Sequence, residues 1–179
     1  MPVSDRQKRF FSKKPANAMA FKTIEYYHPK FGSKFLLQSN GKVFFDRQLT
    51  IEPEDPNNPG QTVTFKTTSI NIQDPTQKGS ADMTMSASFP SIDAGSEIRA
   101  AIKSLDPFDW FEAPIEQVYR IYESTDTSSP LIVLRLYVSE EGITDNGSSI
   151  TIQAADDNPS DFRVSETYTI ARFPGLTNS

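Results

Sequence analysis

The sequence of 179 residues has no cysteine and a single histidine, His28. Without cysteine the chain cannot form disulfides, cysteine nucleophiles, iron–sulfur clusters or thiolate zinc sites. One histidine cannot build a multi-histidine metal site, and it is the only side chain that ordinarily titrates near neutral pH. Most classes of enzyme are therefore disfavoured, and we expect neither catalytic residues nor a bound cofactor or metal.

Long hydrophobic runs are absent as well. The most apolar run, residues 131–134, is far below the roughly 20 residues of a membrane-spanning helix, so we expect no membrane partner. No apolar stretch of the length found in signal peptides follows the basic residues 6–14, so we expect no signal peptide. The mean hydropathy is −0.48. Aromatic residues nevertheless reach 11%. A core can be built from a few such large side chains, so we expect a folded domain rather than disorder.

The net charge of −5 is unevenly distributed along the chain. Residues 1–34 carry eight basic and two acidic side chains, a net charge of +6, whereas residues 35–179 carry ten basic and 21 acidic side chains, a net charge of −11. A basic arm on an acidic body can bind an acidic partner, remain a solvated tail or bind nucleic acid. Because the acidic body repels phosphates, we expect no nucleic-acid partner. In an oligomer, the arm of one subunit could reach the acidic body of its neighbour.

The hydrophobic pattern predicts a basic, helical arm over residues 1–17 and a single β-rich domain over residues 18–179. The arm carries a short helix at 4–12, ended by Pro15. Period-two alternation predicts strands at 19–28, 34–39, 42–45, 63–72, 81–89, 115–122, 131–138, 149–154 and 165–170. Asn40-Gly41 predicts a hairpin between the second and third of these strands.

The only internal segment with helical periodicity is 96–105, with Asp93 or Ser96 as its cap. The spacing of the strands indicates a mainly β fold, an antiparallel β-sandwich or partly open barrel with one short internal helix and an N-terminal basic helical arm. Exposed edges at 63–72 or 165–170 could add to a neighbour's sheet.

Two groups of polar residues could carry chemistry. His28 is either a catalytic base or a residue at a strand end that orders the turn before Pro29, and we prefer the second interpretation. Acidic clusters at 52–55, 106–112, 140–145 and 156–161 could bind calcium, but none has the ligand spacing of the twelve-residue calcium loop. A carboxylate pair for glycoside hydrolysis could be drawn from almost any two of these acids, so the pattern carries no signal.

Residues 106–111 place three large aromatic side chains between acidic ones. They form either an aromatic loop that faces a sugar or a protein partner, or a plug of core residues between the helix and the next strand. We favour the core, and we keep Trp110 as a candidate binding residue if it is exposed.

Four segments together resemble a family of bacteriophage tail-associated proteins. They are IEYYHPKF at 24–31, GSEIRAAI at 95–102, VYRIYESTDTSSP at 118–130 and YTIARFPGL at 168–176. The resemblance spans about residues 4–176 and depends on the order and spacing of the segments.

The resemblance implies a structural virion protein. Its expected role is that of a minor tail protein, a ring-forming adaptor at the tail tip or baseplate that joins the tube or distal tail protein to the hub. Expected partners are the distal tail protein, hub, tape measure or tube, and further copies of the chain in a threefold or sixfold ring, assembled in the host cytoplasm. The family brings no catalytic residues.

The candidate contact residues combine the arm, the aromatic segment and the C-terminal segment. They are Arg6, Lys8, Arg9, Phe10, Phe11, Lys13, Lys14, Trp110, Arg172 and Phe173. Two alternatives stay open: a carbohydrate- or receptor-binding β-sandwich module that uses Trp110, and a cell-wall hydrolase that uses His28 and carboxylates.

Overall fold

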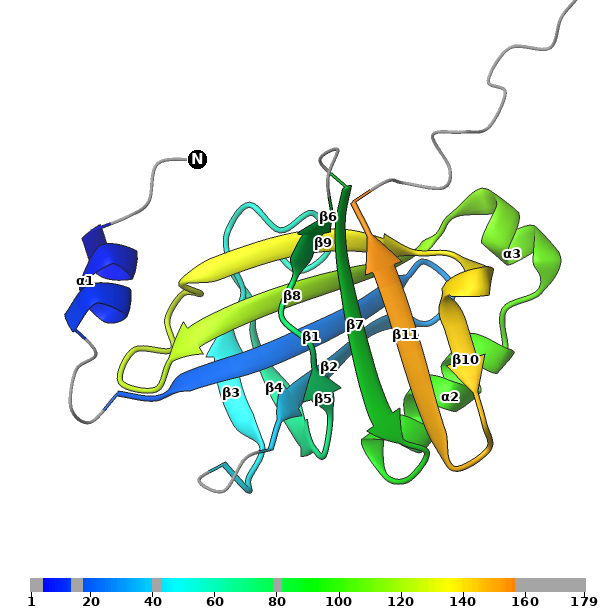
Figure 1. Cartoon of the computed structure of the whole chain (residues 1–179), viewed down its shortest axis with the longest axis horizontal. Coiled ribbons are helices and arrows are strands. Elements are labelled where there is room, and N and C mark those ends of the chain that lie inside the picture. Colours follow the sequence, from blue (N-terminus) through cyan, green and yellow to red (C-terminus); the bar gives the residue numbers. More distant parts are fainter. Residues whose placement is uncertain (1–4, 14–17, 40–42, 79–81, 157–179) are drawn as a thin grey trace, which may run out of the picture.

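The computed structural model describes residues 5–13, 18–39, 43–78 and 82–156 (Figure 1). Its helical elements are α1 (Asp5–Lys13), α2 (Ala94–Lys103), α3 (Pro107–Glu112) and the 3-10 turn η1 (Glu140–Gly142). Its strands are β1 (Ala20–His28), β2 (Gly32–Gln38), β3 (Arg47–Thr50), β4 (Thr62–Thr68), β5 (Asn71–Ile72), β6 (Thr76–Lys78), β7 (Asp82–Pro90), β8 (Ile115–Glu123), β9 (Ile132–Val138), β10 (Ile143–Asp145) and β11 (Ser149–Ala155).

All described strands belong to one open sheet with the order β3-β4-β2-β1-β8-β9-β11-β7-β5, to which β10 adds on β11 and β6 on β7. Every pairing is antiparallel except that of β2 with β4. The predicted mainly β fold is confirmed, and the sheet does not close into a barrel.

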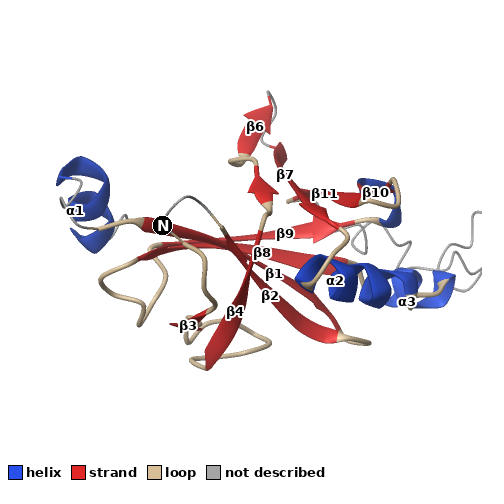
Figure 2. Ribbon diagram, turned by 90° about the horizontal axis from the view of Figure 1, so that it is seen from below, coloured by secondary structure: helices blue, strands red, loops and turns tan. Residues whose placement is uncertain are grey.

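The sheet bends at two weak junctions. β2 and β4 share three register pairs, and β9 and β11 share only Ala155 with Tyr137. As Figure 2 shows, β7 and β11 therefore lie on one side of a middle layer of β1, β2, β8 and β9, and β3 and β4 lie on the other side.

The larger core lies between the middle layer and the layer of β7 and β11. Ile24 and Tyr119 from the middle layer pack in this core with Phe89 and Ile152 from the layer of β7 and β11. Ile98 of α2 belongs to the same core. All five are almost fully buried. Each such side chain contributes about 1.5–3 kcal/mol by leaving water, so this face supplies much of the driving force for folding.

A smaller core lies on the opposite face of the middle layer. Phe21, Leu37 and Tyr122 pack there against Leu49 and Phe65 from β3 and β4. Since β1, β2 and β8 are covered on both faces, they show no simple alternation of apolar and polar residues.

Several predicted elements differ from the observed ones. Residues 43–46 contain no strand, so the hairpin predicted at Asn40-Gly41 does not pair β2, whose neighbours are β1 and β4. The predicted strand 63–72 divides into β4 and β5, and because β4 lies between β2 and β3, only β5 stands at an edge. The predicted strand 165–170 lies outside the described residues.

The helices also depart from the prediction. The arm helix is found at Asp5–Lys13, and the described chain contains two internal α-helices instead of one. Asp93 occupies the N-cap of α2 with a positive φ of 46° but makes no side-chain cap bond. The Ser96 hydroxyl instead donates to the Asp93 carbonyl at 2.7 Å.

Candidate functional site

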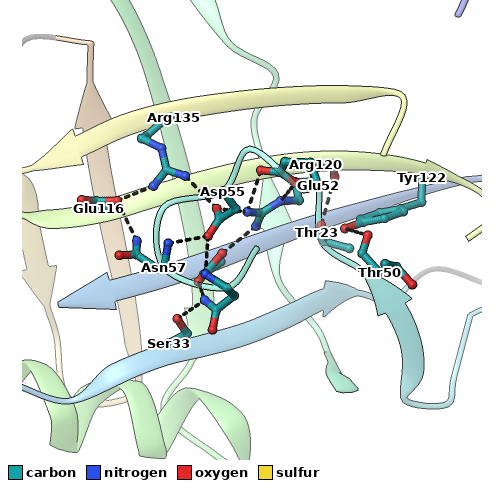
Figure 3. Close-up of polar contacts among 12 residues, drawn as sticks. Thr23, Ser33, Thr50, Glu52, Asp55, Asn57, Glu116, Arg120, Tyr122 and Arg135 are labelled. Atoms are coloured by element: carbon teal, nitrogen blue, oxygen red, sulfur yellow. Dashed lines mark hydrogen bonds and ion pairs between the residues drawn. The ribbon is translucent and has the colours of Figure 1, made fainter. Parts of the chain in front are cut away.

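The densest cluster of charged side chains surrounds Arg120, in the middle of β8 (Figure 3). The guanidinium has no exposed surface and contacts three carboxylates. Nη1 donates to Glu25 and Nη2 to Asp55, each at 2.7 Å. Nε and Nη2 donate to the two carboxylate oxygens of Glu52, at 2.7 and 3.0 Å.

The fold brings these residues together from three places in the sequence. Glu25 and Arg120 lie on neighbouring strands β1 and β8, on the face that carries the smaller core. Glu52 and Asp55 come from the connection between β3 and β4, residues 51–61, which passes over this face (Figure 3).

Arg135 of β9 extends the cluster by contacting both Asp55 and Glu116. Two asparagines of the connection complete it. The Asn57 side chain donates to Glu116 at 3.2 Å, and the Asn58 side chain donates to Glu25 at 2.9 Å and to the Ser33 hydroxyl at 2.8 Å.

The pKa of Asp55 is lowered. Burial acts to raise it, but the backbone N–H groups of Asn58 and Asn57, which donate to the carboxylate at 2.7 and 2.9 Å, and the charge of Arg120 outweigh burial. The pKa of Arg120 is raised: burial acts to lower it, and the bonds and charges of Glu52 and Glu25 overcome that effect. Both groups therefore stay ionised in the folded protein.

We interpret this cluster as a structural clamp that holds the 51–61 connection on the sheet. Each of its carboxylates contacts an arginine, so the negative charges of the cluster are paired with positive charges inside it. Among the described residues, no group of three or more His, Asp or Glu side chains is arranged to hold a metal ion. Within the same ranges, no helix is long and apolar enough to cross a membrane.

His28 is buried at the end of β1 with both ring nitrogens engaged. Nδ1 accepts from the backbone N–H of Lys30 at 3.1 Å, which leaves Nε2 protonated to donate to the carbonyl of Ala113 at 3.2 Å. The ring also stacks on Phe31, with centroids 5.5 Å apart. This is the geometry of the turn-ordering residue expected from the sequence.

The aromatic segment 106–111 forms the short helix α3 instead of a loop or a core plug. Asp106 caps it by accepting from the N–H groups of Phe108 and Asp109, both at 2.9 Å. Phe108 and Phe111 are 64% and 63% exposed, so the prediction that they fill the core is wrong. Trp110 is half-buried and packs against the larger core.

Trp110 also lines a depression of about 340 Å³. Its other walls come from α2, from η1 and β10, and from β11. They include the apolar residues Ile102, Leu105, Ile143 and Ile150 and the charged residues Arg99, Lys103, Glu140 and Asp145. Asp145 accepts from Arg99 at 2.8 Å and contacts Lys103 at 3.2 Å, so its charge is balanced within the wall.

The arm helix α1 lies beyond one end of the sheet, against the end of β8 and the connection from β8 to β9 (Figure 1). Arg6 donates to Ser129 Oγ at 2.7 Å and to the carbonyl of Asp126 at 2.6 Å, and it forms ion pairs with Glu123 and Asp126. Phe10 is buried in the larger core. Of the arm residues predicted to contact a partner, these two therefore contact their own domain, whereas Lys8, Arg9 and Phe11 are exposed.

The remaining candidate contacts cannot be placed. The side chain of Lys13 and the whole of Lys14, Arg172 and Phe173 lie outside the described part of the chain.

The geometry defines a class of protein, a bent, open β-sheet domain with helices at its surface, but not a family. The models of known protein families give no match to this chain, and no curated protein matches it.

Proposed function

We propose that the chain is a structural subunit of a bacteriophage tail, a ring-forming adaptor at the distal end that joins the tube or distal tail protein to the hub. The assignment to a tail depends on the resemblance of the four sequence segments. The assignment to a protein that acts by binding other proteins depends on the surface of the fold.

The observation that carries the proposal is the exposure of large apolar side chains in groups. Phe108 and Phe111 are exposed together on α3, and Phe44 and Phe45 are exposed together on the segment before β3. Isolated exposed apolar residues are ordinary, but grouped ones mark surfaces that other proteins cover. Separate surfaces of this kind suit a subunit that contacts several neighbours at once.

The arginine cluster supports the same function by making the body rigid. Because Arg120 and Arg135 tie the 51–61 connection to β1, β8 and β9, the long polar segment between β3 and β4 is fixed on the sheet. A ring subunit must present its contact surfaces in a constant geometry, since small angular errors accumulate around the ring.

The test is the protein content of purified tails of the virus that encodes the chain. We expect the chain in every tail, at the distal end when it is labelled for electron microscopy, and in a copy number that is a multiple of three. A chain that is absent from tails, and that does not bind the tail proteins on co-expression, would contradict the proposal.

The depression lined by Trp110 favours a second candidate, a carbohydrate- or receptor-binding module of the tail tip. An indole offers an apolar face and an N–H donor, and with charged groups beside it this combination suits a ligand that has both apolar C–H faces and hydroxyl groups. In this case Trp110→Ala abolishes binding on a glycan array, whereas Phe108→Ala, which removes a neighbouring exposed ring, does not. If neither variant changes glycan binding, or if no binding is found for the unaltered chain, this candidate fails.

A further inference from the structure

We propose that the exposed face of α1 of one copy of the chain docks on α3 of the next copy, in a head-to-tail contact. The inference rests on the proposed ring formation and names the two surfaces that would form the ring. The two helices lie at opposite ends of the molecule in both views (Figures 1 and 2). Each copy therefore carries one of the two surfaces at each end.

One face of α1 is exposed at the surface of the fold. Arg6, Gln7 and Phe10 lie on the side of the helix that contacts the connection between β8 and β9 and the larger core. Lys8 and Phe11, three residues apart, lie next to each other on the exposed surface of the helix, and Phe11 is 51% exposed. Phe11 packs edge-on against Phe10, with centroids 5.3 Å apart, so the exposed ring is supported by the buried one.

The surface of α3 also presents exposed aromatic rings beside charged side chains, but its charges are negative. Phe108 and Phe111 are again three residues apart and exposed, and the half-buried Trp110 anchors the helix to the core. The same short segment carries three carboxylates: Asp106 at the N-cap, Asp109 in the first turn and Glu112 at the last position of the helix.

Lys30 lies beside the acids of α3 but does not neutralise them. Its ammonium group donates to Asp109 and lies 3.9 Å from Asp106. The hydrogen bond from Lys30 is the main cause of the lowered pKa of Asp109, so this carboxylate stays ionised. Three carboxylates and one ammonium group leave the α3 surface negative.

Charge complementarity selects the pairing of α1 with α3. Arg6 is paired with Glu123 and Asp126 inside the subunit, and Lys8 and Arg9 are the exposed basic side chains of the described part of α1. Two copies of α1 repel one another, and so do two copies of α3, which disfavours a twofold dimer through either helix. The unlike pair combines opposite charges around apolar centres, which favours encounter and fixes orientation. A contact between different surfaces at opposite ends propagates from copy to copy and closes into a ring when the rotation permits.

The test uses two variants that each destroy one surface. The α1 variant is Lys8→Ser with Phe11→Ser, and the α3 variant is Phe108→Ser with Glu112→Ser. All four positions are exposed, so both variants are expected to fold with unchanged circular dichroism. The matched control is Ile92→Ser with Lys66→Ser, which also removes one large exposed apolar side chain and one exposed charge.

Sedimentation of each protein at low salt measures self-association. We expect the full chain and the control to associate, and each variant alone to associate at least about tenfold more weakly, as truncation of a central aromatic contact predicts. A mixture of the two variants should form a heterodimer and nothing larger, because only one pair of intact surfaces remains.

Three results would overturn the inference: self-association that survives in both variants, self-association lost in the control but not in the variants, or a full chain that remains monomeric. In each case the presence of the chain in purified tails is an independent measurement. Failure of the contact and failure of the proposed function are therefore distinguishable.

Discussion

At the scale of single residues, the strongest constraint in the fold is the burial of Arg120. Its guanidinium and the carboxylates of Glu25 and Asp55 have no exposed side-chain surface. Removing charges from water costs several kcal/mol for each ion, and only well-placed opposite charges offset that cost. Each member of the cluster therefore depends on the presence of the others.

We predict that Arg120→Met lowers the free energy of unfolding by about 3–5 kcal/mol, because it leaves buried carboxylates without their partner. Arg135→Met should cost clearly less, because Arg135 is 23% exposed. Urea unfolding followed by circular dichroism measures both. A cost for Arg120→Met below that for Arg135→Met would show that the cluster does not stabilise the fold in this way.

The lowered pKa of Asp55 predicts a pH dependence with a definite sign. Since the folded state binds the proton of Asp55 less readily than the unfolded state, this group stabilises the fold above its unfolded pKa of about 3.9. The contribution is lost as the pH falls through the lower pKa of the folded state.

Unfolding in urea at a series of pH values between neutral and strongly acidic should therefore show a shallower loss of stability in Asp55→Asn than in the unaltered chain. Glu54→Gln, a change in an adjacent exposed carboxylate, is the control and should leave the slope unchanged. Equal slopes for all three proteins would assign the acid sensitivity to other groups.

At the scale of elements, strand positions could be predicted from the sequence better than strand neighbours. Alternation placed the strands 81–89, 115–122, 131–138 and 149–154 close to β7, β8, β9 and β11. The prediction of a hairpin at Asn40-Gly41 was wrong because a turn signal is local, whereas β2 pairs with its second neighbour, β4, across the intervening residues 39–61.

The arginine cluster could not be predicted from the sequence for the same reason. A charged residue in the middle of the apolar strand 115–122 was a visible signal that Arg120 would need partners. Its partners stand 65 to 95 residues away along the chain, so no single-sequence pattern joins them. The capping pattern of Asp106 and Asp109 around Pro107 was a local signal for α3.

The docking of α1 at the end of the sheet predicts a difference between its two phenylalanines. Phe10→Ala should lower the free energy of unfolding by roughly 1–3 kcal/mol, because it removes a ring buried in the larger core. Phe11→Ala should change it by less than about 0.5 kcal/mol, because that ring is mostly exposed. Thermal melts compare the two variants directly, and equal melting temperatures would mean that α1 is not docked in solution.

At the scale of the whole molecule, the uneven distribution of charge along the sequence becomes a separation of basic and acidic helices in space. The basic helix lies at one end of the long axis and the acidic α3 at the other (Figure 1). Part of the basic charge is already used inside the subunit, because Arg6 pairs with Glu123 and Asp126. What remains for a neighbour is the outer face of α1, which makes the arm both a part of the fold and a contact surface.

Deletion of residues 1–15 separates these two roles. The truncated chain should keep its sheet but melt at a lower temperature, because it loses the packing of Phe10 and the bonds of Arg6. It should also fail to self-associate at any salt concentration. The full chain, in contrast, should associate strongly at low salt and weakly at high salt, since added ions screen charges at the surface. Sedimentation across a salt series compares the two chains. Association of the truncated chain at low salt as strong as that of the full chain would remove the arm from the contact between subunits, while the melting temperature would still report its place in the fold.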